Sequence, residues 1–437
     1  MTTSPTQESH RLRRRRLGLG LMVVAGLLLA VLLGWLGWVE HQVRLAQQDI
    51  QARRFTKALE RLTLAMQTHQ HRPGLVFQAA QTARRAQDFD QAEALLDRFF
   101  QMTNKAYTPE IHLERELTRA QQGTLPQSIE KQLHLFAVTE NPYTALVAEA
   151  LVYPYLRTSR LQQAIACLDG WLKVEPDNTW ALNRRAHAYD RLGHYDDAIT
   201  DYQKVIELDP DDRKATIRLA QLLLNERRNP QEAEPLFQRV VDEQPDNAEG
   251  KTGLAQCLAA RGQTQEALQQ LDDVLREAPT NVNALVERGK VALILQRYQS
   301  AETDLRKALD LARYDPRVYY NLLLALKGQK GREKDAEAMS ADLARVNTDH
   351  RRMEELIKKY TSDANNVGLL VEVAQIYLRY DLPREAMPFL NRALDRAPYD
   401  PKVHASLAEA WAKLGNLDQA RIHRQQAGLP SNSAAKK

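Results

Sequence analysis

Prolines recur at a nearly constant interval along the middle of this chain. Pro176, Pro210, Pro245 and Pro279 are separated by 34, 35 and 34 residues. A period of about 20 to 50 residues indicates a protein built from stacked copies of one small structural unit. Each unit then packs only on its neighbours, so a chain of 437 residues needs no single large core.

Each interval contains two amphipathic helical patterns, most clearly in residues 179–210. Apolar residues recur at helical spacing on both helices. On the first helix they are Leu182, Ala186 and Tyr189, and on the second they are Ala198, Tyr202, Val205 and Leu208. Gly193 follows the first pattern and Pro210 the second, and these residue types are typical just beyond helix ends. No strand-like alternation occurs, so we expect an all-α fold.

Small residues at two fixed positions recur from unit to unit. The eighth residue is Ala186, Ala220, Ala255 and Gly289 in turn. The twentieth is Ala198, Ala267 and Ala301, and in the unit of Ala220 the corresponding Ala233 comes one place later. With the 34-residue period and the closing proline, the chain resembles the tetratricopeptide repeat (TPR) family. The resemblance implies an α-solenoid of about eleven helix pairs over residues 41–427. It also implies a groove, lined by the first helix of each pair, that binds protein partners.

The period slips once, near residues 347–365. This stretch adds half a repeat, and we predict a lone helix over 348–360 that forms a joint. The joint divides the solenoid into a first section, residues 40–346, and a second section, residues 366–428. Residues 429–437 are polar and small, and we expect a disordered tail there.

An uncharged run extends from Leu17 to Val39. As a helix it would be about 34 Å long, enough to cross a hydrocarbon core of about 30 Å, so a transmembrane helix is predicted at 17–39. A cleaved signal peptide is the alternative, but its apolar region is usually only about 7 to 15 residues long. Gly26, Ala30 and Gly34 form a small-xxx-small face that favours self-association through the span.

Five arginines lie in the basic tail, residues 1–16, directly before this run. The positive-inside rule keeps such a tail in the cytoplasm. If the chain is bacterial, the protein would then be a single-pass protein of the inner (cytoplasmic) membrane with its TPR body in the periplasm.

The sequence shows no catalytic constellation. It contains no glycine-rich phosphate loop, HExxH, GxSxG or CxxC, so we expect no enzyme activity, no metal and no cofactor. Cys167 and Cys257 are expected to be small buried residues. Residues 1–40 carry +3 of the formal net charge of +4, and a nearly neutral body argues against a nucleic-acid partner.

Recognition chemistry is expected along the first helices. The family's pattern places groove-facing residues second, fifth, ninth and twelfth or thirteenth in each unit. The predicted protein-binding residues are Tyr153, Trp180, Asn183, His187, Arg191, Lys214, Gln221, Asn225, Gln256 and Lys290. Their amides could pair with a partner's backbone, and Trp180 could stack on it. The alternative is an ordinary solvated face. The Lys/Asn/Arg carboxylate clamp and the asparagine ladder of some TPR proteins are not reproduced in order.

Together these features predict a membrane-anchored TPR scaffold that mediates protein–protein interactions. It would serve the assembly or operation of a cell-envelope complex in polysaccharide export, secretion or protein maturation. The alternative keeps the fold but faces the cytoplasm, as a membrane-anchored regulator of the assembly or turnover of a membrane enzyme.

Overall fold

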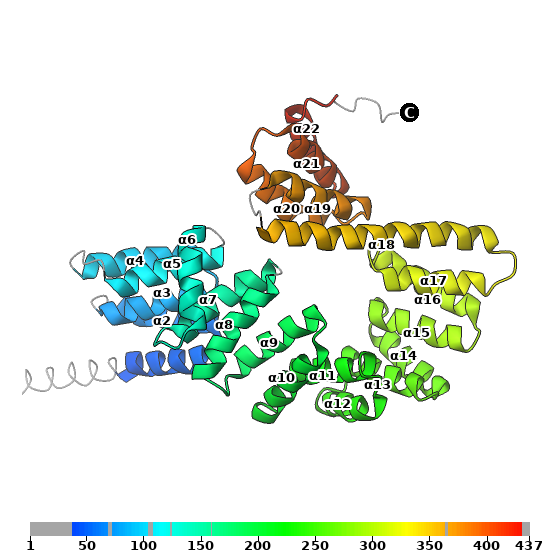
Figure 1. Cartoon of the computed structure of the whole chain (residues 1–437), viewed down its shortest axis with the longest axis horizontal. Coiled ribbons are helices and arrows are strands. Elements are labelled where there is room, and N and C mark those ends of the chain that lie inside the picture. Colours follow the sequence, from blue (N-terminus) through cyan, green and yellow to red (C-terminus); the bar gives the residue numbers. More distant parts are fainter. Residues whose placement is uncertain are drawn as a thin grey trace, which may run out of the picture. The chain divides into compact units, whose positions relative to one another are not determined.

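The computed structural model describes residues 37–68, 72–103, 108–122, 125–158, 160–362 and 366–430. Every regular element within these ranges is a helix (Figure 1). Residues 37–51 are helical, and α2 to α22 follow them. The chain divides into two compact units. The first is Met1–Phe136 with Glu149–Pro154, and the second is Ala137–Ala148 with Tyr155–Lys437.

The first unit contains the helices drawn in blue and cyan in Figure 1. They are α2 (Phe55–Thr68), α3 (Pro73–Arg85), α4 (Phe89–Met102), α5 (Pro109–Gln122) and most of α6 (Gln127–Val138). Its core contains Val39, Leu62, Ala80 and Leu96, all fully buried. Val39 therefore packs against repeat helices.

The second unit carries the regular helix pairs. They are α9 (Thr179–Leu192) with α10 (Tyr195–Leu208), α11 (Arg213–Asn225) with α12 (Pro230–Glu243), α13 (Ala248–Ala260) with α14 (Thr264–Glu277), and α15 (Val282–Ile294) with α16 (Tyr298–Leu311). Before them come α7 (Thr144–Arg157), which is shared between the units, and α8 (Leu161–Val174). After them come α17 (Pro316–Lys327), α18 (Glu333–Ser362), α19 (Val367–Arg379), α20 (Pro383–Arg396), α21 (Pro401–Lys413) and α22 (Leu417–Gln426).

Side-chain caps set the start of the first helix in the repeats from α9 onward. The carboxamide or carboxylate oxygen of the residue before the helix accepts a hydrogen bond from a backbone N–H of the first turn, which has no partner inside the helix. These caps are Asn178, Asp212, Asn247, Asn281, Asp315, Asn366 and Asp400.

The small residues of the period lie where helices approach most closely. Ala186, Ala220 and Ala255 are fully buried, as are the four corresponding alanines of the second helices. At Gly289, an added Cβ would lie 2.8 Å from Cγ of Leu305, so the site has no room for a side chain. The all-α solenoid predicted from the period is confirmed.

The membrane-spanning part of the predicted fold is wrong. Residues 17–36 of that segment, with Gly26, Ala30 and Gly34, lie outside the described residues, and residues 37–39 begin the helix that packs on the first repeat. Among the described helices, none combines the length and the apolar character needed to cross a membrane. Even α18, with 30 residues, carries charged side chains throughout. The fold class is therefore an all-α TPR solenoid.

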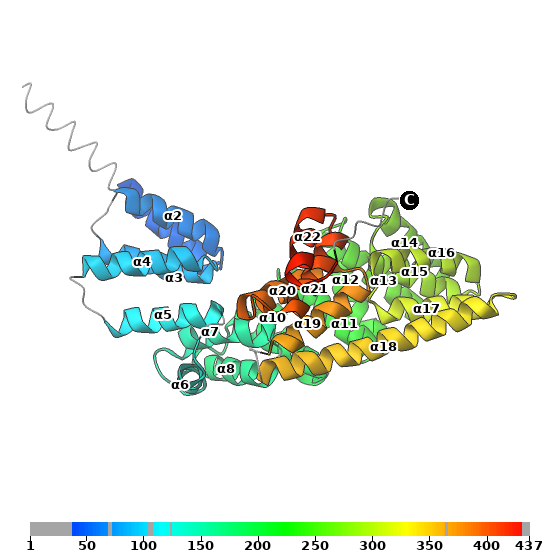
Figure 2. The ribbon, with the colours of Figure 1, turned by 90° about the horizontal axis from the view of Figure 1, so that it is seen from above.

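The half-repeat slip takes the form of one long helix, α18, which packs on α17 and on α19 (Figure 2). Its first half serves as the second helix of the α17 repeat. Its second half binds α19: Arg352 donates to Glu372 at 2.7 Å, and the Tyr380 hydroxyl donates to Asp349 at 2.8 Å. The predicted lone helix at 348–360 is thus the C-terminal half of α18, because no helix-breaking residue separates it from the preceding repeat.

Candidate protein-binding groove

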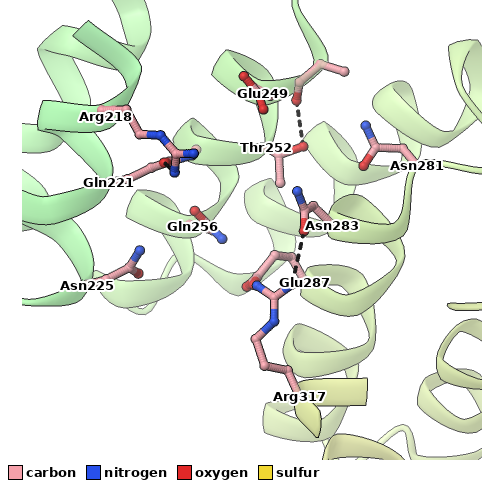
Figure 3. Close-up of a pocket in the computed structure, with 12 residues that line it drawn as sticks. Arg218, Gln221, Asn225, Glu249, Thr252, Gln256, Asn281, Asn283, Glu287 and Arg317 are labelled. Atoms are coloured by element: carbon pink, nitrogen blue, oxygen red, sulfur yellow. Dashed lines mark hydrogen bonds between the residues drawn. The ribbon is translucent and has the colours of Figure 1, made fainter. Parts of the chain in front are cut away.

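A polar pocket of about 350 Å³ lies across α11, α13, α15 and α17, the first helices of four successive repeats (Figure 3). Its lining is mostly amide and charged. It consists of Arg218, Gln221, Asn225, Ala248, Glu249, Thr252, Gly253, Gln256, Asn281, Asn283, Glu287 and Arg317. Stacking of the repeats therefore turns equivalent helix faces into one continuous polar surface.

Gly253 lies in the floor of this pocket on α13. Its helix approaches α12 closely: a Cβ on Gly253 would lie 2.3 Å from a ring carbon of Phe237, which is fully buried. The equivalent residues of the neighbouring first helices, Arg218 and Glu287, are long and charged. At Gly253 the Phe237 ring occupies the space that a side chain would fill, so a long charged residue does not fit there.

Several polar groups in the pocket are available to a ligand. In the part of the chain that the structure describes, Asn225, Glu249 and Gln256 have no intramolecular hydrogen-bond or ion-pair partner. The Gln221 carbonyl accepts a bond of 3.0 Å from Arg218, which leaves its NH₂ group free to donate. A carboxamide can donate and accept at once, as a peptide unit does, so this lining matches an extended backbone.

The predicted site residues are only partly brought together here. Gln221, Asn225 and Gln256 line the pocket. Lys290 lies near it on α15 and is paired with Glu287 at 2.8 Å. Lys214 is exposed at the start of α11. Tyr153, which is 41% exposed, belongs to the first unit and is therefore not part of this groove.

The predicted residues of α9 have structural contacts as well. Trp180 is half-buried, with its ring centroid 5.2 Å from that of Trp171 in the preceding helix. Asn183 donates to Asp212 of the next repeat at 3.0 Å, and Arg191 donates to the carbonyl of Leu156 at 2.7 Å. Trp180 and Asn183 therefore hold adjacent repeats together, which limits what they offer a partner.

His187 lies on α9 within a group of arginines. Burial lowers its pKa below the ordinary value, and the guanidinium charges of Arg191 and Arg184 lower it further, against the carboxylate of Asp190. The charge of Arg218 on α11 also lowers the pKa of His187. The His187 Nδ1 atom is buried and has no hydrogen-bond partner among the described residues. Of these arginines, Arg218 also lines the pocket.

Sequence reasoning missed the sixth position of each unit. Arg218, Gly253 and Glu287 occupy it, and all three line the pocket. Helical spacing could have found them, because the sixth and ninth positions lie three residues apart on one face. Metal-binding clusters of three or more His, Cys, Asp or Glu are absent from the described part of the chain, and His69 and His71 lie outside it.

Models of the tetratricopeptide repeat match residues 183–248, 225–288 and 282–315 in succession, and another matches 73–98 and 401–423. These matches cover the same helix pairs that the period and the structure define. The chain belongs to the tetratricopeptide repeat family. TPR proteins mediate protein–protein interactions, so this chain is a member of a family that binds protein partners.

Two relatives illustrate the similarity in sequence. DnaJ homolog subfamily C member 3 of Gallus gallus is 25% identical over 222 residues, which make up 47% of this TPR protein and 43% of the relative. DnaJ protein P58IPK homolog B of Oryza sativa subsp. japonica is 30% identical over 174 residues, 36% and 37% of the two chains. The matched part spans less than half the length of either relative.

Two solved structures are similar to this chain in fold. MamA residues 41 to the end, from Desulfovibrio magneticus RS-1, is 21% identical and matches 39% of this chain and 95% of that chain, with a TM-score of 0.35. YrrB, described as a TPR protein with an unusual peptide-binding site, is 21% identical and matches 43% and 96%, also with a TM-score of 0.35.

Proposed function

We propose that this TPR protein is a scaffold that binds an extended segment of a protein partner in the pocket across α11 to α17. The observation that carries the proposal is a set of amide and carboxylate groups that have no side-chain partner among the described residues: Asn225, Glu249 and Gln256, on successive first helices. Asn225 and Glu249 are exposed and Gln256 is half-buried, so a ligand that covers them must complete their hydrogen bonds. A peptide backbone supplies donors and acceptors at regular intervals, as this pocket requires.

The lining favours a peptide over a small apolar ligand. Small-molecule sites are predominantly hydrophobic with a few polar groups, whereas the residues around this pocket are mostly amide or charged. Equivalent positions of neighbouring repeats also lie in a row, which suits a linear ligand. The alternative of an ordinary solvated face predicts no binding that depends on these side chains.

The larger biological setting remains a prediction from the sequence. Service in the assembly or operation of a cell-envelope complex, and the absence of enzyme activity, are proposals that the described residues do not test. The groove proposal does not depend on either. A scaffold of this kind would act by holding its partner segment at a fixed place along the solenoid.

Selection of peptides from a random library displayed on phage tests this function. The purified full chain is the bait, and selected peptides are labelled and measured by fluorescence anisotropy. The test variant is Asn225→Ala/Gln256→Ala. Each lost hydrogen bond costs about 0.5 to 1.5 kcal/mol, so binding should weaken about tenfold.

The matched control is Gln265→Ala/Gln269→Ala. Both residues are exposed on α14, outside the pocket lining. This control should bind as the original chain does. The proposal is overturned if no peptide is selected, or if every selected peptide binds the two double variants equally well.

A further inference from the structure

The arginine cluster beside the pocket identifies the chemistry of the partner segment. We propose that the groove takes an acidic peptide, whose carboxylates lie over Arg184, Arg191 and Arg218 while its adjoining backbone occupies the pocket of α11 to α17. This inference rests on the proposed function, and it specifies the charge of the partner peptide and where its charged part lies in the groove.

Arg184 and Arg218 differ from most arginines of the described repeats in their lack of an ion-pair partner. No carboxylate in the described ranges forms an ion pair with either of them. Arg184 is exposed, with its guanidinium carbon 5.4 Å from the centroid of the Trp180 ring. The Arg218 guanidinium donates only to the neutral carbonyl of Gln221. Arg185, next in the chain, binds Asp169 at 2.7 Å and Asp201 at 2.8 Å.

Arg184 and Arg191 lie three residues before and four residues after His187 on α9, so they share a helix face with it. The charge of Arg218, on the adjoining α11, lowers the pKa of His187 as theirs do, and Asp190 opposes them. The buried Nδ1 atom has no partner within the described residues, although buried ring nitrogens usually have one. Cationic groups this close together repel one another, and a ligand carboxylate would relieve that repulsion.

Continuity with the pocket sets the placement. Arg218 lines the pocket on α11, and the N-cap of that helix, Asp212, accepts a hydrogen bond from Asn183 of α9. Beyond Arg218 the lining changes, because Glu249 is acidic and Glu287 is already paired with Lys290. Carboxylates are therefore favoured on the α9 side and disfavoured towards α13 and α15. An acidic stretch joined to a neutral or basic stretch complements this distribution.

Nucleic acid is the other class of polyanion that arginines attract. It would need basic residues along the whole path of its phosphates. Here the basic cluster is followed by Glu249 and Glu287 within one pocket. The structure therefore favours an acidic peptide, and an oligonucleotide serves as a competing probe in the experiment.

Two displayed libraries distinguish the possibilities, with the full chain as bait. Each displayed peptide has four restricted positions followed by eight random positions. The restricted positions are Asp or Glu in the acidic library and Asn or Gln in the amide library. Peptides from the acidic library should be enriched. Their affinity should fall about tenfold for Arg184→Glu/Arg218→Glu, since each reversal replaces attraction with repulsion. Added salt should also weaken the binding of these acidic peptides.

The matched control reverses two charges elsewhere. Arg297→Glu/Lys307→Glu changes exposed residues at the start of α16 and on α16, away from the pocket lining. It should leave affinity unchanged, whereas an equal loss in this control would overturn the inference, because only total charge would then matter. Tighter binding of a labelled 20-residue oligothymidylate than of any selected peptide, abolished by Arg184→Glu/Arg218→Glu, would also overturn it.

Failure of the inference is distinguishable from failure of the proposed function. If peptides of the amide library bind as tightly as acidic ones and still require Asn225 and Gln256, the acidic specificity is wrong and the groove function stands. If peptides from neither library depend on these two residues, both are wrong.

Discussion

Replacing Gly253 with alanine tests the close packing that shapes the pocket. A Cβ built on Gly253 would lie 2.3, 2.4 and 2.5 Å from three ring carbons of Phe237. Ordinary carbon–carbon contacts are about 3.5 to 4.0 Å, so ring and helix must separate by more than about 1 Å. Phe237 is fully buried, which leaves its ring no room to swing aside.

Two opposing effects decide the outcome. Alanine is favoured over glycine inside a helix by about 1 kcal/mol. Overpacking a buried site costs about 1 to 3 kcal/mol, and here the added atom meets a rigid ring. We therefore expect Gly253→Ala to lower the free energy of unfolding by about 1 to 2 kcal/mol. Gly253→Ala/Phe237→Leu should recover about 1 kcal/mol relative to the sum of the two single changes.

Urea unfolding followed by circular dichroism measures the effect, with hydrogen exchange of α12 and α13 to localise it, because repeat arrays need not unfold in a single step. Gly74→Ala is the control. Gly74 lies in α3, and a Cβ there would meet nothing within 4 Å, so this variant should lose no stability. If Gly253→Ala proves as stable as the original chain, the close approach of α12 and α13 is wrong.

Three further predictions concern charged and titrating groups. Arg288→Met leaves the carboxylate of Asp304 buried without its 2.6 Å bond, which should cost about 1 to 3 kcal/mol and lower the urea midpoint. Burial alone would raise the pKa of Glu302, but hydrogen bonds led by that of Arg332 lower it to about 2. The ionised carboxylate of Glu302 therefore stabilises the fold above about pH 4.5, and this stabilisation is lost as the pH falls towards 2. In Glu302→Gln, the thermal midpoint should depend less on pH over that range. Burial lowers the pKa of His423, so its neutral form is favoured by folding, and stability should fall as the pH drops below about 6.5. A midpoint equally sensitive to pH in His423→Gln would contradict this.

The repeat architecture followed from the sequence because its determinants are local. The closing prolines, the caps such as Asp212 and the small residues such as Ala186 act within one or two neighbouring helices. Their spacing alone fixes the helix pairs. The joint was harder to predict, because the continuity of α18 depends on apolar residues such as Met353 and Leu356 that pack against α19. A helical pattern does not show where one helix stops when no breaker intervenes.

The predicted membrane helix failed for a different reason. The length and apolar character of residues 17–39 predict a membrane span, but Val39 at the end of this run is buried against the first repeat. An apolar residue can pack on protein or on lipid, and hydropathy alone does not distinguish the two environments.

The site was predicted in part, because the family pattern names positions but not pairings. It correctly placed Gln221, Asn225 and Gln256 in one groove. It could not show that the amide of Asn183 is already used by Asp212, 29 residues further on. Nor did it reveal the close contact at Gly253, since that contact depends on how closely α12 approaches α13.

The pairing of arginines offers a rule that a sequence can apply. Arg185 lies 16 residues from both Asp169 and Asp201 and binds both of them. Three repeats later, Arg288 lies 16 residues from Asp272 and Asp304 and makes the same contacts. Both arginines are seventh in their units, so the spacing places each guanidinium between aspartates of two consecutive second helices.

Arg184 and Arg218 are sixth, and neither has aspartates at that spacing. One step of about 100° around the helix separates an arginine that joins repeats from one that faces the groove. Reversal of a seventh-position arginine should therefore unfold repeats, whereas reversal of a sixth-position arginine should change binding alone.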